Sequence, residues 1–338
     1  MVDLASSYVC SKSFSPSVAD TLFVAKSRKT VRAILRRQDP RWLLLVGPCS
    51  IHDPLAAYEY GQRLRVLAQE VESKFFIVMR AYVEKPRTTV GWKGFLYDPD
   101  LNGSYDIERG VQETRRLFAQ LTNLRLPLGS EILELNTVQF YRDYLSWGCI
   151  GARTCASSPH RQVASGLPFA VGFKNGLDGC TETAIQGLVA AAQSHVFLGI
   201  QPHGSLGRIV TQGNPSCHMV LRGGMHGPNY FPANLHACVA QARQYGVAAH
   251  VVIDCSHDNS HKQYAQQANV FREVCEQSRM IDTPIVGMML ESFLEAGNQP
   301  IEGPLQWGIS VTDGCMDWSK QEDLIHTAYD NVTLHRGT

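Results

Sequence analysis

Residues 42–49 read WLLLVGPC, an apolar run that ends in Gly-Pro-Cys. A short apolar run bounded by turn residues is typical of a strand buried on both faces, as in a parallel sheet. Segments with apolar residues at helical spacing separate several runs of this kind. Eight buried strands alternating with helices predict an α/β fold, a (β/α)8 TIM barrel, with an open doubly wound sheet as the alternative. The eight predicted strands cover residues 42–49, 75–82, 128–133, 149–153, 169–174, 218–222, 250–255 and 284–291.

A pair of short apolar segments interrupts this alternation before the sixth strand. Residues 195–200 read HVFLGI and residues 208–211 read RIVT, with Gly204 and Gly207 between them. Two such runs joined by a few residues that include glycine are typical of a β-hairpin. We therefore predict an inserted β-hairpin at about residues 195–211.

The start of the chain differs in composition from the rest. Residues 1–38 are mostly polar, and we predict that they form an N-terminal arm. Residues 39–338 then form one barrel, a length that a single α/β barrel can reach. Within the arm, residues 28–37 read RKTVRAILRR and predict a short basic helix. The simplest interpretation of this helix is that it is solvated on the protein surface.

The composition is that of a globular protein. Charged residues make up 18% of the 338 residues, below the roughly 25% of average chains, which argues against a disordered protein. The 31 basic and 31 acidic residues balance, so nothing supports a nucleic-acid or membrane partner. The ten cysteines contain no Cys-x-x-Cys pair, and no secretory signal or membrane-length apolar run is visible. We expect a cytoplasmic protein with reduced thiols.

Basic side chains stand at or just after the ends of several predicted strands. In a barrel, the C-terminal ends of the strands meet at one face, where active sites lie. Arginine pairs with phosphate or carboxylate through two parallel hydrogen bonds, and lysine adds a point charge. The pattern predicts a phosphorylated, carboxylated substrate, and a ring of solvated surface charges is the alternative. The cations are Arg80, Lys85, Arg153, Lys174 and Arg222.

A second group at the strand ends offers metal ligands. Cys49, His257, Glu291 and Asp313 combine a thiol, an imidazole and two carboxyl groups. That mixture suits one borderline divalent ion, such as Mn²⁺, Fe²⁺, Co²⁺ or Zn²⁺. Their spacing is not a metal signature, and each residue taken alone also fits an ordinary buried or strand-end position.

A long loop follows the second predicted strand. Residues 83–103 contain glycine and proline, and loops of this length are usually functional or mobile. Lys85, Pro86, Arg87 and Thr88 place two cations and a hydroxyl around a stiff proline. This segment predicts a site for a second phosphate, with an exposed basic loop as the alternative.

These motifs together resemble a known family, the class I, microbial-type 3-deoxy-D-arabino-heptulosonate 7-phosphate (DAHP) synthases. The resemblance runs from about residue 24 to the C-terminus, with the motifs in the family's order. The motifs that carry it are GPCSIHDP at residues 47–54, MRAYVEKPRTTVGWKG at 79–94, IGART at 150–154, VGFKNG at 171–176, LRGG at 221–224, IDCSHDNS at 253–260, GNQ at 297–299 and SVTDG at 310–314.

The resemblance implies a (β/α)8 barrel that condenses phosphoenolpyruvate with erythrose 4-phosphate and releases phosphate, at the start of the shikimate pathway. It implies that the divalent metal is held by Cys49, His257, Glu291 and Asp313. It implies that phosphoenolpyruvate is bound by Arg80, Arg153, Lys174 and Arg222. It implies that Lys85 reaches both substrates and that the erythrose 4-phosphate site includes Pro86, Arg87 and Thr88.

Two catalytic assignments rest on chemistry joined to that resemblance. Lys85 is our candidate general acid for the alkoxide that develops on the aldehyde, with a metal-bound water as the rival. Glu131, at the end of the third predicted strand, is a candidate for positioning water.

The resemblance also implies feedback regulation and a homodimer or homotetramer. In the family, the N-terminal arm packs on a neighbouring subunit and forms an allosteric site with the inserted hairpin. Gly199 stands where phenylalanine-sensitive relatives tend to have serine and tyrosine-sensitive ones glycine. An aromatic amino acid, tyrosine rather than phenylalanine, is therefore the expected inhibitor.

Two other functions compete with this one. The related 3-deoxy-octulosonate 8-phosphate synthases take arabinose 5-phosphate, but they carry a different, Asn-containing loop where this chain has residues 85–88. A catalytically silent barrel with a regulatory role is the third hypothesis. The intact ligand and cation set argues against a silent barrel.

Overall fold

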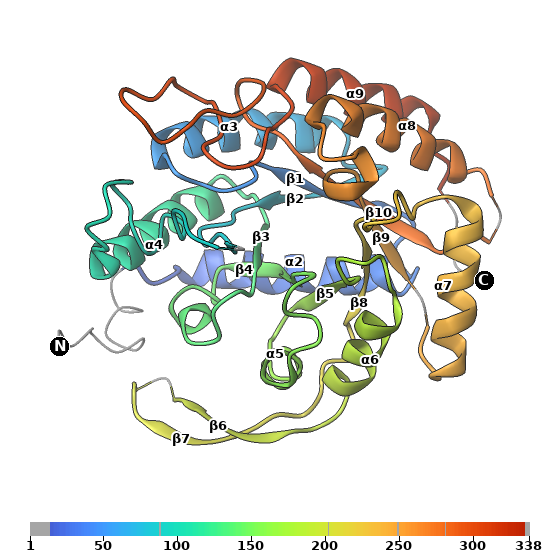
Figure 1. Ribbon diagram of the computed structural model, residues 1–338, viewed down its shortest axis with the longest axis horizontal. Coiled ribbons are helices and arrows are strands. Elements are labelled where there is room, and N and C mark those ends of the chain that lie inside the picture. Colours follow the sequence, from blue (N-terminus) through green and yellow to red (C-terminus); the bar gives the residue numbers. More distant parts are fainter. Residues whose placement is uncertain (1–13, 88, 202, 249, 281, 335–338) are drawn as a thin grey trace.

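Eight parallel strands close into a barrel in this computed structural model, which describes residues 14–334 except positions 88, 202, 249 and 281. Around the ring their order is β1-β10-β9-β8-β5-β4-β3-β2 (Figure 1). The predicted (β/α)8 barrel is confirmed, and the open doubly wound sheet is excluded. The barrel strands are β1 Trp42–Gly47, β2 Phe75–Arg80, β3 Leu128–Glu131, β4 Leu145–Ile150, β5 Ala170–Lys174, β8 His218–Leu221, β9 Val251–Asp254 and β10 Ile285–Glu291.

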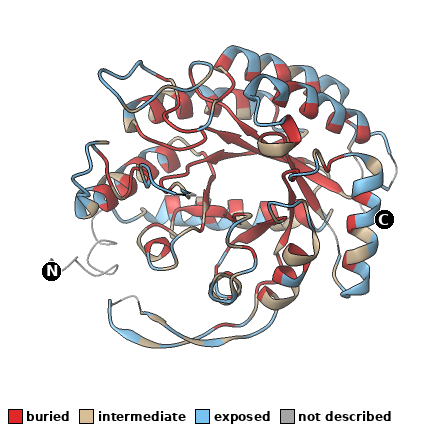
Figure 2. Ribbon diagram, in the orientation of Figure 1, coloured by how far each residue is buried: buried red, intermediate tan, exposed pale blue. Residues whose placement is uncertain are grey.

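Helices surround the barrel, with buried faces toward the strands and exposed faces outward (Figure 2). Several begin at an aspartate whose carboxylate accepts backbone N–H bonds of the first turn, as Asp53 does for α3 and Asp317 for α9. The α-helices are α2 Val18–Leu35, α3 Pro54–Glu70, α4 Ile107–Asn123, α5 Ser158–Ala164, α6 Glu182–Ala191, α7 Pro232–Gln244, α8 Gln267–Gln277 and α9 Trp318–Asn331. Short 3₁₀ turns are η1 Thr137–Phe140, η2 His257–Ser260 and η3 Tyr264–Gln266.

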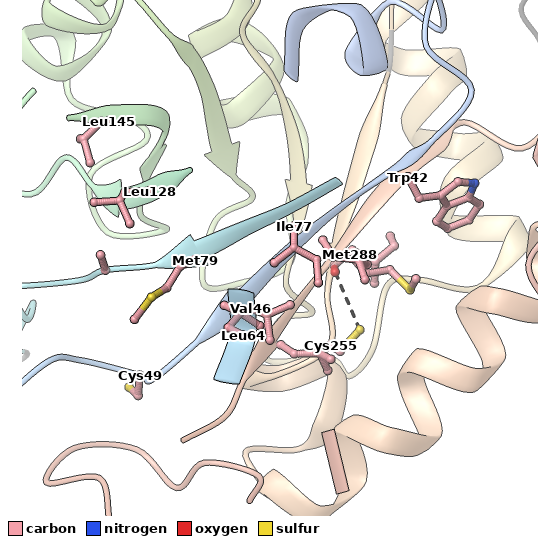
Figure 3. Packing of buried hydrophobic residues seen from close by; sticks show 14 of the residues in the cluster. Trp42, Val46, Cys49, Leu64, Ile77, Met79, Leu128, Leu145, Cys255 and Met288 are labelled. Carbon is pink, nitrogen blue, oxygen red and sulfur yellow. Dashed lines mark hydrogen bonds between the residues drawn. The ribbon is translucent and has the colours of Figure 1, made fainter. Parts of the chain in front are cut away.

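A large apolar layer packs the strands against these outer helices. Figure 3 shows Trp42 and Cys49 near opposite ends of β1, with Val46 between them. Leu64 of α3 belongs to the same cluster as Val46. Because both faces of β1 are covered, its six residues are all buried, which explains the continuous apolar run in the sequence.

The fourth barrel strand starts earlier than the sequence predicts. β4 covers Leu145–Ile150 rather than residues 149–153. Ser146 interrupts the apolar pattern and hides the start of the strand, yet it is completely buried. Arg153 lies in the turn that follows the strand.

Helix α2 closes the N-terminal end of the barrel, a region that we call the floor. Val31, Ile34 and Leu35 are buried and belong to one cluster with interior barrel residues such as Leu43 and Trp147. In Figure 1 the helix runs behind β4 and β5. Residues 18–35, which the sequence predicts to be part of the arm, therefore share a hydrophobic core with the barrel.

Basic residues of this helix bind the backbone where strands begin. The Arg28 guanidinium donates to the carbonyl of Leu145 at 2.7 Å, and Arg32 donates to the carbonyl of Pro168 at 2.6 Å. Just beyond the helix, Arg37 donates to the carbonyls of Thr283 and Ile285. The interpretation of residues 28–37 as a solvated surface helix is thus wrong, because these cations satisfy carbonyls at the barrel floor.

The predicted hairpin is present before the sixth barrel strand. Its strands β6 (Val196–Ile200) and β7 (Leu206–Val210) pair antiparallel and extend away from the barrel (Figure 1). Exposure alternates along both strands, since one face of a two-stranded ribbon lacks a covering layer. The exposed face carries Val196, Leu198, Leu206 and Val210.

Across the described ranges, every helix is too short or too polar to cross a lipid bilayer.

Candidate active site

The C-terminal ends of the barrel strands deliver the predicted site residues to one place, which we call the mouth. A cavity of about 1270 Å³ opens there. Every predicted site residue that the structure describes lines it, whereas Thr88 lies outside the described residues. Those that end a strand are Arg80, Glu131, Lys174 and Glu291. Those that follow a strand are Cys49, Lys85, Pro86, Arg87, Arg153, Arg222, His257 and Asp313.

The backbone at the end of β1 allows a close approach to β2. A Cβ atom on Gly47 would lie 2.6 Å from the Arg80 carbonyl oxygen, too close for any side chain. Glycine at this position therefore lets the chain pass β2 and carry Cys49 into the mouth.

Three of the predicted metal ligands form a compact cluster. One ligand atom each from Cys49, Glu291 and Asp313 lies within 4.8 Å of the others. The fourth, His257, places Nε2 4.0 Å from Oε1 of Glu291. Sulfur, nitrogen and carboxylate oxygen are the donors expected for a borderline divalent ion, so these residues fit such an ion.

The imidazole of His257 lies beside a buried carboxylate. Its Nδ1 lies 2.9 Å from Oδ2 of Asp254, which is fully buried. A carboxylate beside one ring nitrogen is the usual arrangement for a metal-binding histidine, because it leaves the other nitrogen available. His257 also adopts a left-handed backbone with φ 54°, a conformation that costs energy and is often found at functional sites.

Lys85 brings a positive charge directly to the ligand cluster. Its Nζ donates to Sγ of Cys49 and to Oδ2 of Asp313, both at 2.8 Å. Burial disfavours the ammonium, but the neighbouring Cys49 and Asp313 outweigh that effect and raise the pKa of Lys85. Burial likewise disfavours the Asp313 carboxylate, yet Lys85 lowers the pKa of this group. Lys85 is therefore charged. Its raised pKa makes the ammonium a weaker acid than that of an ordinary lysine, so only a strongly basic group such as an alkoxide can take its proton.

For Cys49 the neighbouring charges do not outweigh burial. It raises the pKa of the thiol to about 12, and the nearby Glu291 adds to the shift. The thiol is therefore protonated at neutral pH in the protein without metal. A bound metal ion needs the thiolate, so binding there must release a proton.

Three further cations of the mouth, Arg80, Lys174 and Arg222, are buried and lie beside carboxylates, whereas Arg153 is exposed. Arg80 donates to Oε1 of Glu291 at 2.9 Å, and its guanidinium lies 4.1 Å from the Tyr82 ring centroid. Nε of Arg80 has no hydrogen-bond partner within the described part of the chain. Lys174 lies 2.9 Å from Oδ2 of Asp254. A buried guanidinium with an unused donor beside a cavity is suited to bind an anion.

Three more predicted residues line the cavity from β3 and from the loop after β2. Glu131 lies against Gly151, where a Cβ would be 2.3 Å from its Oε1. Pro86 and Arg87 come from the loop, and the Arg87 guanidinium lies against Gly91.

Two acidic residues at the mouth were missed by the sequence analysis. Asp254 is the last residue of β9 and contacts both His257 and Lys174. Asp258 forms an ion pair with Arg222. A carboxylate that ends a buried apolar run was a signal for Asp254, but only the folded chain reveals the partner of Asp258.

The arrangement can bind two anionic substrates beside a divalent ion. Cations along the cavity would neutralise phosphate and carboxylate groups that otherwise repel each other. The ligand cluster can hold a Lewis acid, and Lys85 can deliver a proton at the same place.

Comparison with known proteins agrees with this chemistry. The chain is 45% identical over 322 residues to the Tyr-sensitive phospho-2-dehydro-3-deoxyheptonate aldolase of Escherichia coli K12, covering 94% of this chain and 90% of that relative. It is 44% identical to the Trp-sensitive enzyme of the same strain, covering 92% and 89%. The structure of phospho-2-dehydro-3-deoxyheptonate aldolase from Francisella tularensis SCHU S4 superimposes with a TM-score of 0.96 at 40% identity, covering 100% of this chain and 99% of that one.

The match to a family model supports the same relationship. The model of the DAHP synthetase I family matches residues 22–326, which include all eight barrel strands and the inserted hairpin. That match, and the identity to relatives over nearly their whole length, leave no large part of the barrel unaccounted for. The chain belongs to the DAHP synthetase I family.

Proposed function

We propose that this chain condenses phosphoenolpyruvate with D-erythrose 4-phosphate and water to give DAHP and phosphate, the first step of the shikimate pathway. The observation that carries the proposal is the joining of a metal-ligand cluster and a set of cations in one cavity of about 1270 Å³. Membership of the DAHP synthetase I family supports the same reaction. The enzyme is then a 3-deoxy-7-phosphoheptulonate synthase, a transferase.

The proposed cofactor is one divalent metal ion, Mn²⁺, Fe²⁺, Co²⁺ or Zn²⁺. Its ligands would be Cys49, His257, Glu291 and Asp313, whose donor types suit such an ion. When bound, the ion supplies Lewis-acid polarisation of the erythrose 4-phosphate aldehyde. Asp254 holds the His257 ring in the orientation that this role needs.

Phosphoenolpyruvate is assigned to the cations that surround the cavity. Its phosphate and carboxylate would bind to Arg80, Arg153, Lys174 and Arg222, all of which line the cavity. These contacts fix the enol carbon against the second substrate and exclude competing orientations. The second phosphate, on erythrose 4-phosphate, is assigned to Pro86, Arg87 and Thr88 in the loop after β2.

The bond changes follow from this placement. The enol carbon of phosphoenolpyruvate attacks the aldehyde carbon and forms the new C–C bond. Lys85 donates its proton to the alkoxide that develops on the aldehyde oxygen. Water adds to the second carbon of phosphoenolpyruvate, where Glu131 positions it. The C–O bond to phosphate then breaks as the added oxygen becomes the ketone oxygen, and the two protons of the water pass to Lys85 and to the departing phosphate. The position of Lys85 against Cys49 and Asp313 supports the proton transfer.

Phosphate release from phosphoenolpyruvate tests the reaction. Metal-loaded protein receives erythrose 4-phosphate in one assay and arabinose 5-phosphate in another, each with and without EDTA. We expect release with erythrose 4-phosphate alone and loss of release in EDTA. Turnover with arabinose 5-phosphate would favour the octulosonate enzyme, and no turnover with either sugar would favour a silent barrel.

We also propose feedback inhibition by an aromatic amino acid, tyrosine in particular. Relatives are named Tyr-sensitive and Trp-sensitive. A second cavity of about 850 Å³ supports the proposal, since it lies between the hairpin and the segments around Glu134 and Gln162. Gly199 of the hairpin lines it. Adding tyrosine, phenylalanine or tryptophan to the same assay identifies the inhibitor.

A homodimer or homotetramer is the proposed assembly. The exposed apolar face of the hairpin supports an oligomer, because Val196, Leu198 and Leu206 are each more than 60% exposed in the single chain. The N-terminal arm of residues 1–38 would then contribute to contacts between subunits. Sedimentation equilibrium measures the assembly directly.

A further inference from the structure

Each of four cations in the mouth has a carboxylate partner. The pairs are Arg80 with Glu291, Lys85 with Asp313, Lys174 with Asp254 and Arg222 with Asp258. An anionic substrate that binds these cations must therefore share or replace existing carboxylates. The four carboxylates differ in whether they also belong to, or contact, the metal-ligand cluster.

Three of these carboxylates either belong to the metal-ligand cluster or contact one of its residues. Glu291 and Asp313 belong to the cluster itself, and Asp254 lies against the ring of His257. Asp258 has no such contact within the described part of the chain. Its carboxylate meets Nη1 of Arg222 through Oδ2, and its Oδ1 lies 3.7 Å from Nζ of Lys262.

The main chain already holds Arg222 in place without this carboxylate. The backbone N–H groups of Asp258 and Asn259 both donate to the Arg222 carbonyl, at 3.1 and 3.2 Å. The Arg222 N–H donates to Oδ1 of Asn175 at 2.9 Å, and both of these side chains are buried. The Asp258 side chain is therefore not needed to fix the Arg222 backbone, and its effect is one of charge at the guanidinium.

Asp258 also stands beside a second cation. Lys262 lies four residues further along the chain, is 75% exposed at its side chain and lines the same cavity. Lys262 therefore offers the Asp258 carboxylate a second cationic partner within the same cavity.

We propose that Asp258 is an internal anion that competes with phosphoenolpyruvate for Arg222 and so sets the affinity of the enzyme for that substrate. The inference rests on the proposed function, in which Arg222 binds phosphoenolpyruvate. A guanidinium that binds a carboxylate offers fewer donors to an incoming phosphate, and the carboxylate repels that phosphate. A purely structural role for Asp258 predicts the opposite effect, since its removal would then misplace Arg222 and weaken binding.

The test compares Asp258→Asn with the wild type as metal-loaded enzymes. We expect the KM for phosphoenolpyruvate to fall about two- to fivefold, the range that partly exposed ion pairs cover. The kcat and the KM for erythrose 4-phosphate stay within about twofold. Asp258→Glu, which keeps the charge, stays near the wild type. The matched control is Asp323→Asn, which removes an exposed carboxylate on α9 far from the mouth lining and leaves every constant unchanged.

Lys262 provides a second, independent comparison. Lys262→Gln removes the alternative partner, so the KM for phosphoenolpyruvate rises about twofold. In the Asp258→Asn background the same substitution has no effect, because the carboxylate it acts on is gone. An effect of equal size in both backgrounds would show that Lys262 contacts substrate itself and would overturn its assigned role.

Inorganic phosphate separates this inference from the proposed function. Calorimetry with phosphate alone needs no turnover, and we expect Asp258→Asn to bind it more tightly than the wild type. A wild type that makes no DAHP would overturn the proposed reaction, whatever the phosphate result. An unchanged or raised KM and unchanged or weaker phosphate binding in Asp258→Asn would overturn the inference. Thermal unfolding checks the fold, and Asp258→Ser carries the same expectations if the Asn variant does not fold.

Discussion

The two ends of the barrel differ in the side chains that fill them. At the mouth, buried cations, carboxylates and a thiol line one cavity, and several are paired with a residue from a neighbouring or next-but-one strand. At the floor, α2 places Val31, Ile34 and Leu35 on an apolar interior. The polar atoms there are mainly strand carbonyls, and arginines satisfy some of them.

This difference suggests that the mouth serves the chemistry and the floor serves the stability of the fold. A charged group kept in a low-dielectric site costs stability unless it is paired, so the mouth is organised for function. The floor contains apolar surface that folding removes from water, which is the main favourable contribution to stability. Substitutions at the mouth should therefore change activity more than unfolding, and substitutions at the floor should do the reverse.

The strongest test of this comparison is the removal of a proposed metal ligand at the mouth. Cys49→Ala should lower turnover by more than about 100-fold. Removal of a residue that only hydrogen-bonds to a metal ligand already lowers activity or metal affinity about 10- to 100-fold, and loss of a ligand itself should have a larger effect. The metal content of the purified protein should fall in parallel, while circular dichroism stays unchanged. The control is Cys238→Ala, which removes another buried cysteine, on α7 and away from the cavity. Normal turnover in Cys49→Ala would remove this residue from the metal site.

The matching test at the floor is Ile34→Ala. Ile34 is 1% exposed, so the truncation leaves a cavity and should lower the free energy of unfolding by about 2–4 kcal/mol. The kcat per folded molecule should equal that of the wild type. Chemical denaturation measures the first quantity and steady-state kinetics the second. Leu22→Ala on the same helix is the control, since Leu22 is 66% exposed and its truncation should cost little. A loss of kcat at full folding would break the separation of the two ends.

The smallest expected effect concerns a buried carboxyl beside the mouth. Glu84 accepts hydrogen bonds from Tyr141 at 2.6 Å and Thr137 at 2.7 Å, and burial raises the pKa of Glu84 to about 7. Between pH 4.5 and 7 the unfolded chain loses this proton while the folded chain keeps it. Stability that is fully present below pH 4.5 is therefore lost as the pH rises toward 7.

Glu84→Gln tests this pH dependence. The variant should lack the part of the decline that Glu84 contributes, about 2 kcal/mol of unfolding free energy between pH 5 and 7. Denaturant titrations at several pH values measure it. Ile34→Ala should keep the wild-type slope, because the floor substitution removes no titrating group. Equal slopes in Glu84→Gln and the wild type would contradict the assignment.

Much of the site could be predicted from residue type at the ends of apolar runs. Arg80, Lys174 and Glu291 each end a strand whose other residues are almost all apolar. A charged side chain at such a point must face either the barrel interior or its mouth, so its place follows from local pattern. The motifs around these residues then identified the family.

Other features depended on contacts between residues far apart in the chain. The start of β4 was misplaced because Ser146 broke the apolar pattern, although the strand buries it completely. The basic helix was misread because its charges suggested solvent, whereas Arg28 reaches a carbonyl 117 positions away. No local rule predicts such a partner.

The sequence by itself therefore determined most of the strand positions, the family and most of the groups at the mouth, because apolar runs and residue type are local properties. The tertiary structure alone decided which charges meet. It paired Arg222 with Asp258, placed Lys85 against Cys49, and turned α2 into the floor. The physical reason is that a parallel barrel gathers the ends of its strands and the loops that follow them, from Cys49 to Asp313, at one face, and the energy of a charge depends on its neighbours there.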